Sequence, residues 1–292
     1  MAHTYYSQRQ GLSPFPEGLP LGEVIDLFIR VYEQLGDDGY LTEAFGYDCV
    51  DDGHVDGEVR DAGLELFLSV RKKHLWPIAQ SAPSYKEDDF FDVLEYLFQK
   101  VSKPIKGTYH SYNDCGMHWE SFDRPAGKTY FREKVNSVLD HYEHHFELSP
   151  GGEILSKPDH GFEAIFGATL PSAEQGVIGR VDAAILKFRR HGARLDDRRQ
   201  AVRDLADVLE FLRPTMDKAI TSKDEADLFN LANNFGIRHH NDKQKTSYDK
   251  AIWLSWMFYF YLATIHVILR RAEHHDSRRL KPGAASGVKQ HK

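Results

Sequence analysis

The chain has 292 residues, of which 41% are hydrophobic and 28% are charged, so it has the composition of a folded protein with one large or two ordinary domains and not of a disordered chain. The formal net charge of −7 at first disfavours a nucleic-acid partner, but this charge is unevenly distributed. Residues 174–292 hold 22 Lys and Arg and 15 Asp and Glu, a net of +7, whereas residues 1–173 hold 15 and 29, a net of −14. The two halves either meet different charged partners or differ only in composition, and only the second half is a natural candidate for contact with phosphates.

Two features of the sequence favour the cytoplasm. The two cysteines, Cys49 and Cys115, exclude a framework of several disulfides and suit a reducing compartment. The first ten residues lack the basic start and apolar core of a signal peptide. We therefore expect a cytoplasmic protein.

The first half mixes helix and hairpin signals. Apolar residues at helical spacing predict helices over residues 21–35, 85–101 and 130–145. The second of these helices has acidic residues in its first turn, where the helix dipole favours them. Residues 146–156 alternate in polarity around Ser-Pro-Gly-Gly, which predicts a β-hairpin.

Two stretches of the first half carry no periodic pattern. Residues 46–63 and 103–128 are rich in Gly, Asp, Pro and Tyr, and we expect long irregular loops there. Together with the helices and the hairpin, these loops make the first half an α+β domain, which we place at residues 1–165.

The second half shows only helical patterns after a boundary at residues 158–174, which is rich in Pro, Gly and small residues. Pro214 is expected to bend or interrupt one of the helices. The predicted helices cover residues 173–192, 195–220, 221–236 and about 250–273.

Four helices with short connections predict an all-α, up-and-down four-helix bundle over residues 174–275, followed by a flexible tail over 276–292. The last helix contains 18 residues without a formal charge, which is the lower limit for a membrane-spanning helix. Because this run includes Ser255, Thr264 and His266, we expect the buried centre of a bundle or a dimer interface and no membrane insertion.

The stretch "NNFGIRHHNDKQKTSYD", residues 233–249, joins the last two predicted helices and is the strongest candidate for chemistry. Arg238 offers a planar fork of donors that fits phosphate oxygens. His239 and His240 carry imidazoles that exchange protons near neutral pH. Such groups suffice to cleave RNA without a metal ion, although the same pattern also occurs in solvated turns.

Further cations of the second half are candidates for binding RNA. Asn241, Lys243 and Lys245 follow the histidines directly. Arg189 and Arg190 lie in the basic stretch of residues 187–199, and Arg203 follows on the next helix. Such a stretch either tracks a nucleic-acid backbone or forms a solvated helix end.

Longer segments resemble a known family. The segment "LANNFGIRHHNDKQKTSYDKAIWLSWMFYFYLATIH" and the preceding "RRQAVRDLADVLEFL" are similar to the C-terminal HEPN-type helical domain of prokaryotic abortive-infection proteins. In the first half, "YYSQRQGL", "DDFFDVLEYL" and "REKVNSVLDHYEHHFELSPGGEILSKP" resemble the AbiJ-type N-terminal domain found ahead of such bundles. The resemblance covers most of the chain, and "GIRH" is its sharpest motif.

This resemblance implies a dimeric, metal-independent endoribonuclease that acts as a toxin or effector in antiphage defence. By position, Arg238 would bind the phosphate, His239 would transfer protons with His240 beside it, and Glu210 would orient one of them. The acidic first domain would sense a trigger, bind an antitoxin or restrain the nuclease. No cofactor is implied.

One departure from the family leaves a second reading open. The commonest pattern of HEPN nucleases has a histidine several residues after the arginine, and residues 242–245 hold none. The chain is therefore either a contracted catalytic variant or an inactive module that binds RNA, a nucleotide or a partner protein. A third reading is a scaffold whose aromatic last helix makes a dimer.

The first half offers one further set of candidates, for zinc. His110, Cys115 and His118 fall close together, and Cys49 is the fourth residue of a possible Cys2His2 site. Their spacing is not that of a zinc finger, and isolated cysteines often serve as packing residues, so the sequence favours no metal. The acidic residues 48–58 depart from a calcium-binding loop and indicate an acidic surface loop.

Overall fold

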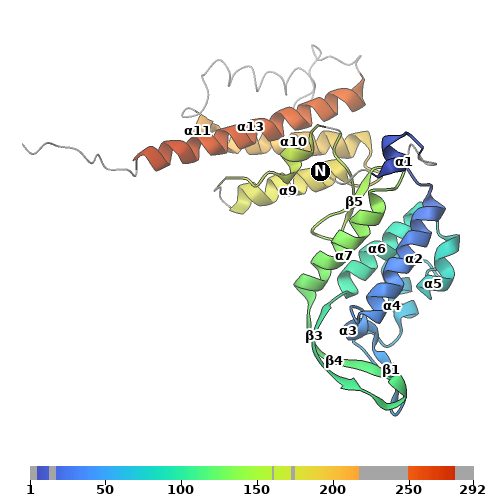
Figure 1. Ribbon diagram of the computed structural model, residues 1–292. Helices are drawn as coiled ribbons and strands as arrows, with labels where there is room; N and C mark the ends of the chain where they lie inside the picture. The colour runs from blue at the N-terminus through green and yellow to red at the C-terminus, as the bar shows by residue number, and fades with distance from the viewer. Residues whose placement is uncertain (1–4, 13–17, 160, 172–174, 217–248, 280–292) are drawn as a thin grey trace, which may run out of the picture. The chain divides into compact units, whose positions relative to one another are not determined.

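The computed structural model describes residues 5–12, 18–159, 161–171, 175–216 and 249–279 (Figure 1). The chain forms two compact units, residues 1–156 and 157–292. The first mixes helices with small sheets and the second is helical over the described residues, so the chain is α+β with a helical C-terminal region.

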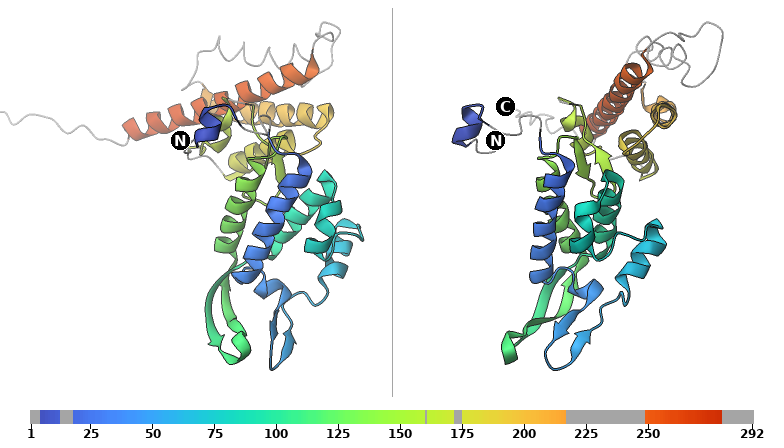
Figure 2. Two further views of the ribbon diagram at one scale, coloured as in Figure 1. Left: turned by 45° about the vertical axis from the view of Figure 1, so that its right-hand side comes forward. Right: turned by 90° about the vertical axis from the view of Figure 1, so that its right-hand side faces the viewer.

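Three helices, α2 (Leu21–Asp37), α6 (Glu87–Lys100) and α7 (Arg124–Leu139), build the first unit. They lie side by side in both views of Figure 2, and their apolar faces share one core. Phe28 of α2 and Phe131 of α7 are fully buried in it. The shorter helices of this unit are α1 (Tyr6–Arg9), α3 (Thr42–Phe45), α4 (Ala62–Val70) and α5 (Ile78–Ser81), with single 3-10 turns η1 (Ala82–Ser84) and η2 (Tyr112–Asp114).

Side-chain caps fix where these helices begin. The carboxylate of Asp89 accepts a hydrogen bond from the backbone N–H of Lys86 at 3.1 Å, which closes the first turn of α6. Asp123 accepts from the backbone N–H of Ala126 at 2.9 Å, and Pro125 supplies a preset φ at the start of α7. The predicted helices at 21–35 and 85–101 are confirmed, whereas the third begins at Arg124 and ends at Leu139.

The strands form three separate antiparallel hairpins. Two of them, β1–β2 and β3–β4, project from the same end of the helical layer in Figures 1 and 2. At Gly107 an added Cβ would lie 2.4 Å from the carbonyl oxygen of His118, so only glycine fits there. The strands are β1 (Tyr47–Cys49), β2 (Gly53–Val55), β3 (Lys103–His110), β4 (Gly116–Asp123), β5 (Phe146–Leu148) and β6 (Ile154–Ser156).

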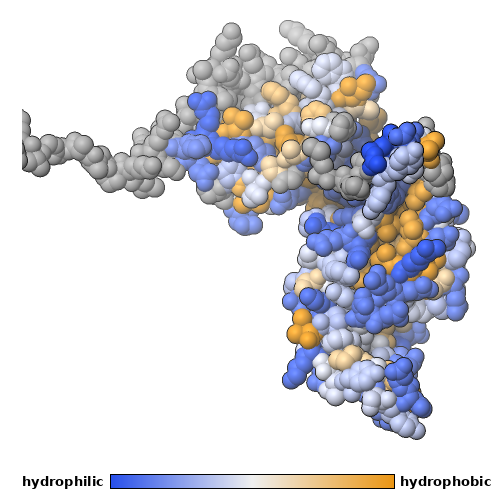
Figure 3. All heavy atoms as spheres, in the orientation of Figure 1, coloured by the Kyte–Doolittle hydropathy of each residue, from blue (hydrophilic) through white to orange (hydrophobic). Residues whose placement is uncertain are grey.

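The predicted hairpin at 146–156 is confirmed, but the two predicted loops are wrong. Residues 46–63 contain β1–β2, and residues 103–128 contain the eight-residue strands β3 and β4. Neither β3 nor β4 buries one face regularly, because most of their side chains are exposed or half-buried. The alternation of polar and apolar residues that reveals a strand is therefore missing. On the face shown in Figure 3, hydrophilic residues cover much of the first unit, whereas hydrophobic side chains gather along α2.

Over its described residues, the second unit contains three long helices, α9 (Gln175–Arg189), α10 (Leu195–Phe211) and α13 (Lys250–Arg279), with short α8 (Glu163–Gly167) and α11 (Arg213–Met216). The long helices share one core, which includes the fully buried side chains of Val202, Leu205, Phe258, Leu262 and Ile265. The break between α10 and α11 falls beside Pro214, as the missing N–H of proline predicts.

The predicted four-helix bundle stays a prediction. Its third helix, expected over 221–236, lies outside the described residues, as does most of the predicted tail. Within α13, the stretch Ala251–His274 is long and apolar enough to cross a membrane. Of its most apolar window, 56% is buried inside the structure, and core helices of soluble proteins pass the same test.

Candidate functional site

The Arg-His string that the sequence singles out lies outside the part of the chain that the structure describes. This holds for all three catalytic candidates of the string and for the three RNA-binding candidates that follow them. They are Arg238, His239, His240, Asn241, Lys243 and Lys245. Asp249, at the end of the string, is described and marks where it joins helix α13.

Asp249 caps α13. Its Oδ1 accepts hydrogen bonds from the backbone N–H groups of Ala251 at 3.0 Å and Ile252 at 3.2 Å. These bonds satisfy two of the free N–H groups that every helix has at its start. The string therefore leads directly into a capped helix. The described residues near the start of that helix form a candidate site.

The remaining candidates of the second unit lie on α9 and α10. Glu210 and Arg203 are both half-buried on α10, and Arg190 is exposed directly after α9. Arg189 was predicted to contact RNA, but only 8% of it is exposed, and its guanidinium lies 4.9 Å from the ring centroid of Phe166. The structure places Arg189 in the interior of the helical unit, which corrects that prediction.

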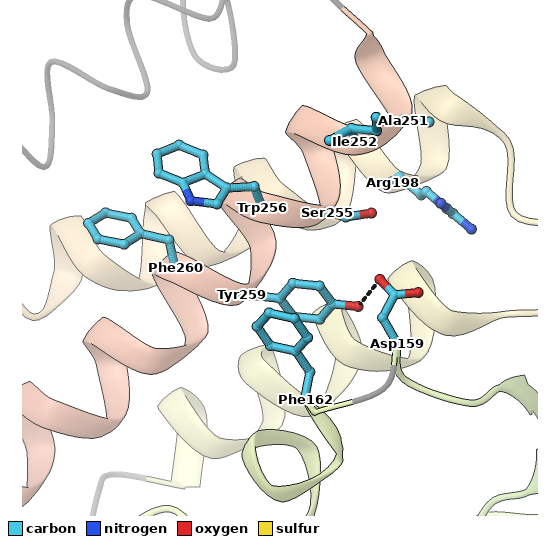
Figure 4. Close-up of a pocket in the computed structure, with 9 residues that line it drawn as sticks. All are labelled: Asp159, Phe162, Arg198, Ala251, Ile252, Ser255, Trp256, Tyr259 and Phe260. Atoms are coloured by element: carbon cyan, nitrogen blue, oxygen red, sulfur yellow. Dashed lines mark hydrogen bonds between the residues drawn. The ribbon is translucent and has the colours of Figure 1, made fainter.

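The basic stretch 187–199 is partly neutralised by nearby acids. Lys187 forms an ion pair with Asp204 at 2.5 Å, and Arg194 lies 4.0 Å from Asp197. Arg198 instead lines a cavity of about 620 Å³ (Figure 4). Of the cations in this stretch, Arg198 has the position best suited to meet a ligand.

The cavity is built from three parts of the second unit. Arg198 comes from α10, two residues come from the segment ahead of α8, and the others come from the first turns of α13. It is therefore formed beside the helix end to which the Arg-His string is joined. The residues that line it are Asp159, Phe162, Arg198, Ala251, Ile252, Ser255, Trp256, Tyr259 and Phe260.

Polar groups lie toward one end of the cavity. In Figure 4 the guanidinium of Arg198 and the carboxylate of Asp159 lie on the side of Ser255, away from the rings of Trp256 and Phe260. The phenol of Tyr259 donates a hydrogen bond to Asp159 Oδ2 at 2.8 Å. Burial, together with this bond, raises the pKa of Tyr259 to about 12, so the phenol keeps its proton at neutral pH. The Nε of Arg198 is buried and has no hydrogen-bond partner among the described residues.

Aromatic rings supply the other surfaces. The rings of Trp256 and Phe260 are stacked at 5.5 Å and 9°, one helical turn apart, and both side chains are about two-fifths exposed. Phe162 stacks on Tyr259 at 4.1 Å and 10°. Flat, exposed rings beside an arginine bind the bases and phosphates of single-stranded nucleic acids. The cavity thus combines exposed aromatic rings with one arginine.

A second group of chemistry-bearing side chains lies in the first unit. Cys49 at the end of β1, His110 at the end of β3, Cys115 in the turn and His118 on β4 each offer a ligand atom, and these four atoms lie within 4.8 Å of one another. The structure thus brings together the four zinc candidates that the sequence could only name. They are residues that could hold a metal ion.

The sequence does not indicate that several of these residues line one cavity. The sequence predicts that the run with Trp256, Tyr259 and Phe260 is the buried centre of a bundle or a dimer interface. Tyr259 is buried, whereas Trp256 and Phe260 are partly exposed, so one face of α13 is not covered by described residues. The available signal was the spacing of Trp253, Trp256 and Phe260, which lie three and four residues apart on one helical face. Asp159 was assigned to the domain boundary, where no contact with α13 could be foreseen.

Comparisons of the chain with models of protein families, with curated proteins and with solved structures gave no match. The likeness to abortive-infection proteins therefore stays an expectation from the motifs, and the function is proposed below from the chain's own residues.

Proposed function

We propose that the chain is a metal-independent endoribonuclease that uses the Arg-His string at residues 236–249. The observation that carries this proposal is the cavity at the start of α13, where Arg198 and exposed aromatic rings surround the helix end to which the string is joined. A pocket that binds a nucleotide would supply substrate binding, and the string of one arginine and two histidines, which joins the same helix in sequence, would supply proton transfer.

The reaction that fits these residues is transesterification. One imidazole, from His239 or His240, takes the proton of the 2′-hydroxyl, and the 2′-oxygen forms a bond to phosphorus. The bond from phosphorus to the 5′-oxygen breaks, and a protonated group returns a proton to that leaving oxygen. Arg238 stabilises the charge on the phosphoryl oxygens, and Glu210 orients either the catalytic arginine or the catalytic histidine. The products are a 2′,3′-cyclic phosphate and a 5′-hydroxyl.

The cavity of the described structure would hold a nucleotide next to the scissile bond. Trp256 and Phe260 offer ring faces for stacking a nucleobase, and the half-buried guanidinium of Arg198, which lines the cavity, suits a phosphate oxygen. The likeness to abortive-infection proteins supplies the biological setting of the proposal. There the enzyme is a cytoplasmic toxin or effector that dimerises through its helical unit, and the acidic first unit meets a trigger or an antitoxin.

The test is cleavage of total cellular RNA and tRNA by the purified full chain in EDTA, beside Arg238→Ala and His239→Ala. We expect wild type to leave 2′,3′-cyclic phosphate ends and each variant to be slower by about 100-fold or more, because each loses a group that acts in the transition state. Cleavage that survives both substitutions, or that appears only with added metal ions, would reject the proposal. Binding of RNA without any cleavage would support the alternative of an inactive RNA-binding module, which the missing distal histidine favours.

A separate prediction concerns the cavity. Trp256→Ala should weaken binding of a single-stranded RNA by roughly 5- to 150-fold, because one stacked base contributes about 1–3 kcal/mol. The affinity is measured by fluorescence anisotropy with a 2′-O-methyl oligonucleotide, which lacks the attacking hydroxyl. Phe211→Ala is the control, since Phe211 is an exposed aromatic side chain of the same unit, at 52%, but does not line this cavity. Equal losses in both variants would contradict the assignment of the cavity.

A further inference from the structure

The tips of two hairpins in the first unit meet at the four side chains of Cys49, His110, Cys115 and His118. We propose that these residues bind one structural zinc ion. The proposal is independent of the ribonuclease, whose chemistry needs no metal and whose candidate residues lie in the second unit.

The geometry is close to that of a tetrahedral site. Cys49 Sγ lies 3.9 Å from His110 Nδ1, and Cys115 Sγ lies 3.3 Å from His118 Nε2. A zinc ion with Zn–S bonds of about 2.3 Å and Zn–N bonds of about 2.0–2.1 Å holds its sulfur and nitrogen ligands about 3.6 Å apart. The four ligand atoms, all within 4.8 Å of one another, need only small side-chain movements to reach these distances.

The ligand set is that of a structural site and not of a catalytic one. Two thiolates and two imidazoles are the donors that zinc prefers, and four protein ligands leave no open position for water or substrate. Two thiolates also balance the charge of the ion. Cys49 is buried and the other three ligands are half-buried, so the site is shielded but within reach of solvent.

The carboxylate of Asp51 lies beside the second ring nitrogen of His110. The Nε2 of His110, the ring nitrogen that faces away from Cys49, lies 3.2 Å from Asp51 Oδ2. In zinc proteins, the second nitrogen of a ligating histidine commonly donates to a carboxylate, which fixes the ring and makes it a better ligand. The carboxylate of Asp52, which lies 3.7 Å from Cys49 Sγ, adds negative charge that attracts a dication.

The two hairpins at this end of the first unit lack a shared sheet, so a metal ion would stabilise their arrangement. β1–β2 and β3–β4 are separate two-stranded sheets that share no ladder of hydrogen bonds. The four ligands lie outside the cluster of buried side chains that holds α2, α6 and α7 together. An isolated hairpin is only marginally stable, and a zinc ion would cross-link the two hairpins, whose described residues lie outside that apolar cluster.

The first test measures metal content and thiol reactivity of the full chain. We expect one zinc ion per chain after reconstitution and dialysis, by mass spectrometry of the metal. Because the chain has two cysteines, a chromogenic disulfide reagent should titrate two thiols after chelation and neither of them with zinc bound. A zinc content far below one per chain, or two reactive thiols in the presence of zinc, would overturn the proposal.

The second test uses cobalt as a spectroscopic probe and compares variants. Wild type titrated with Co²⁺ should show the visible bands of a tetrahedral thiolate site, and Cys115→Ser and His118→Ala should lose them. Asp51→Asn should keep the bands but bind about 10- to 100-fold more weakly. His54→Ala is the control, since His54 lies on β2 outside the four ligands, and its spectrum should equal that of wild type. A wild-type spectrum without these bands, or bands that persist in both ligand variants, would reject the site even if RNA cleavage is normal.

Discussion

Phe258→Ala should lower the free energy of unfolding of the helical unit by about 3–5 kcal/mol, as large-to-small changes of buried phenylalanines do. Phe258 is completely buried on α13, its ring stacks on that of Phe188 at 4.0 Å and 13°, and Phe166 lies 6.0 Å away. The ring therefore joins α8, α9 and α13, and its removal leaves a cavity where these three helices meet. Hydrogen exchange followed by mass spectrometry in increasing urea reports α9, α10 and α13 separately from the first unit.

Phe260→Ala supplies the matched control. Phe260 lies two residues further on the same helix and is 39% exposed, so its loss should change the same free energy by no more than about 1 kcal/mol. If both variants destabilised the helices equally, the arrangement in which one face of α13 is buried and the opposite face is open to the cavity would be wrong.

Asp89→Ala should lower the free energy of unfolding of the first unit by about 1–3 kcal/mol. Asp89 is only 4% exposed, and its carboxylate accepts from Lys72 Nζ at 2.9 Å, from the backbone N–H of Lys86 and from His74 Nε2 at 3.2 Å. Its removal takes away the cap of α6 and the acceptor that His74 Nε2 faces, while Lys72 keeps Asp88 and Asp92, each at 2.8 Å. Urea denaturation followed by hydrogen exchange in α6 measures the effect. Asp88→Ala is the control, because Asp88 also contacts Lys72 but its side chain is 66% exposed.

The same residue makes a prediction about pH. Burial alone would raise the pKa of Asp89, but the hydrogen bonds from Lys72, Lys86 and His74 outweigh it and hold that pKa below its ordinary value. Because the pKa is lower in the folded state than in the unfolded state, the stabilisation by Asp89 is present above about pH 4 and is lost as the pH falls below it. The difference in stability between wild type and Asp89→Ala should therefore shrink in acid. A difference that stays constant down to pH 2 would contradict a charged Asp89.

The sequence predicts those helices and hairpins that are determined by residues close together in the chain. α2 and α6 each bury one apolar stripe, so their helical period is visible, and the acidic first turn of α6 marks its start. The hairpin of β5 and β6 is visible because Ser-Pro-Gly-Gly separates two short apolar runs. The strands β3 and β4 escape because their side chains stay largely in solvent, so their pairing leaves no periodic trace in the sequence.

The candidate sites depend on contacts between distant residues, which is why the sequence could only name their parts. Cys49 lies 61 residues before His110, and nothing in their spacing indicates that Sγ and Nδ1 come within 3.9 Å. The cavity likewise needs Arg198 of α10 beside Trp256 of α13. An apolar run such as residues 252–269 gives only a weak indication of which rings are exposed, because apolar side chains occur on every face of the helix.

The segment ahead of α8 determines where the chain can be cut. The boundary expected from composition, residues 158–174, belongs to the second compact unit, because Asp159 accepts the hydrogen bond of Tyr259, Phe162 covers the Tyr259 ring and Phe166 packs near Phe258. A truncated fragment that starts at residue 174 would bare these rings and tend to aggregate. A fragment that starts at residue 157 keeps Asp159, Phe162 and Phe166, which cover these rings. Inactivity of the shorter fragment would thus reflect an exposed hydrophobic surface. Only the longer fragment is suited to measuring the activity of the helical unit alone.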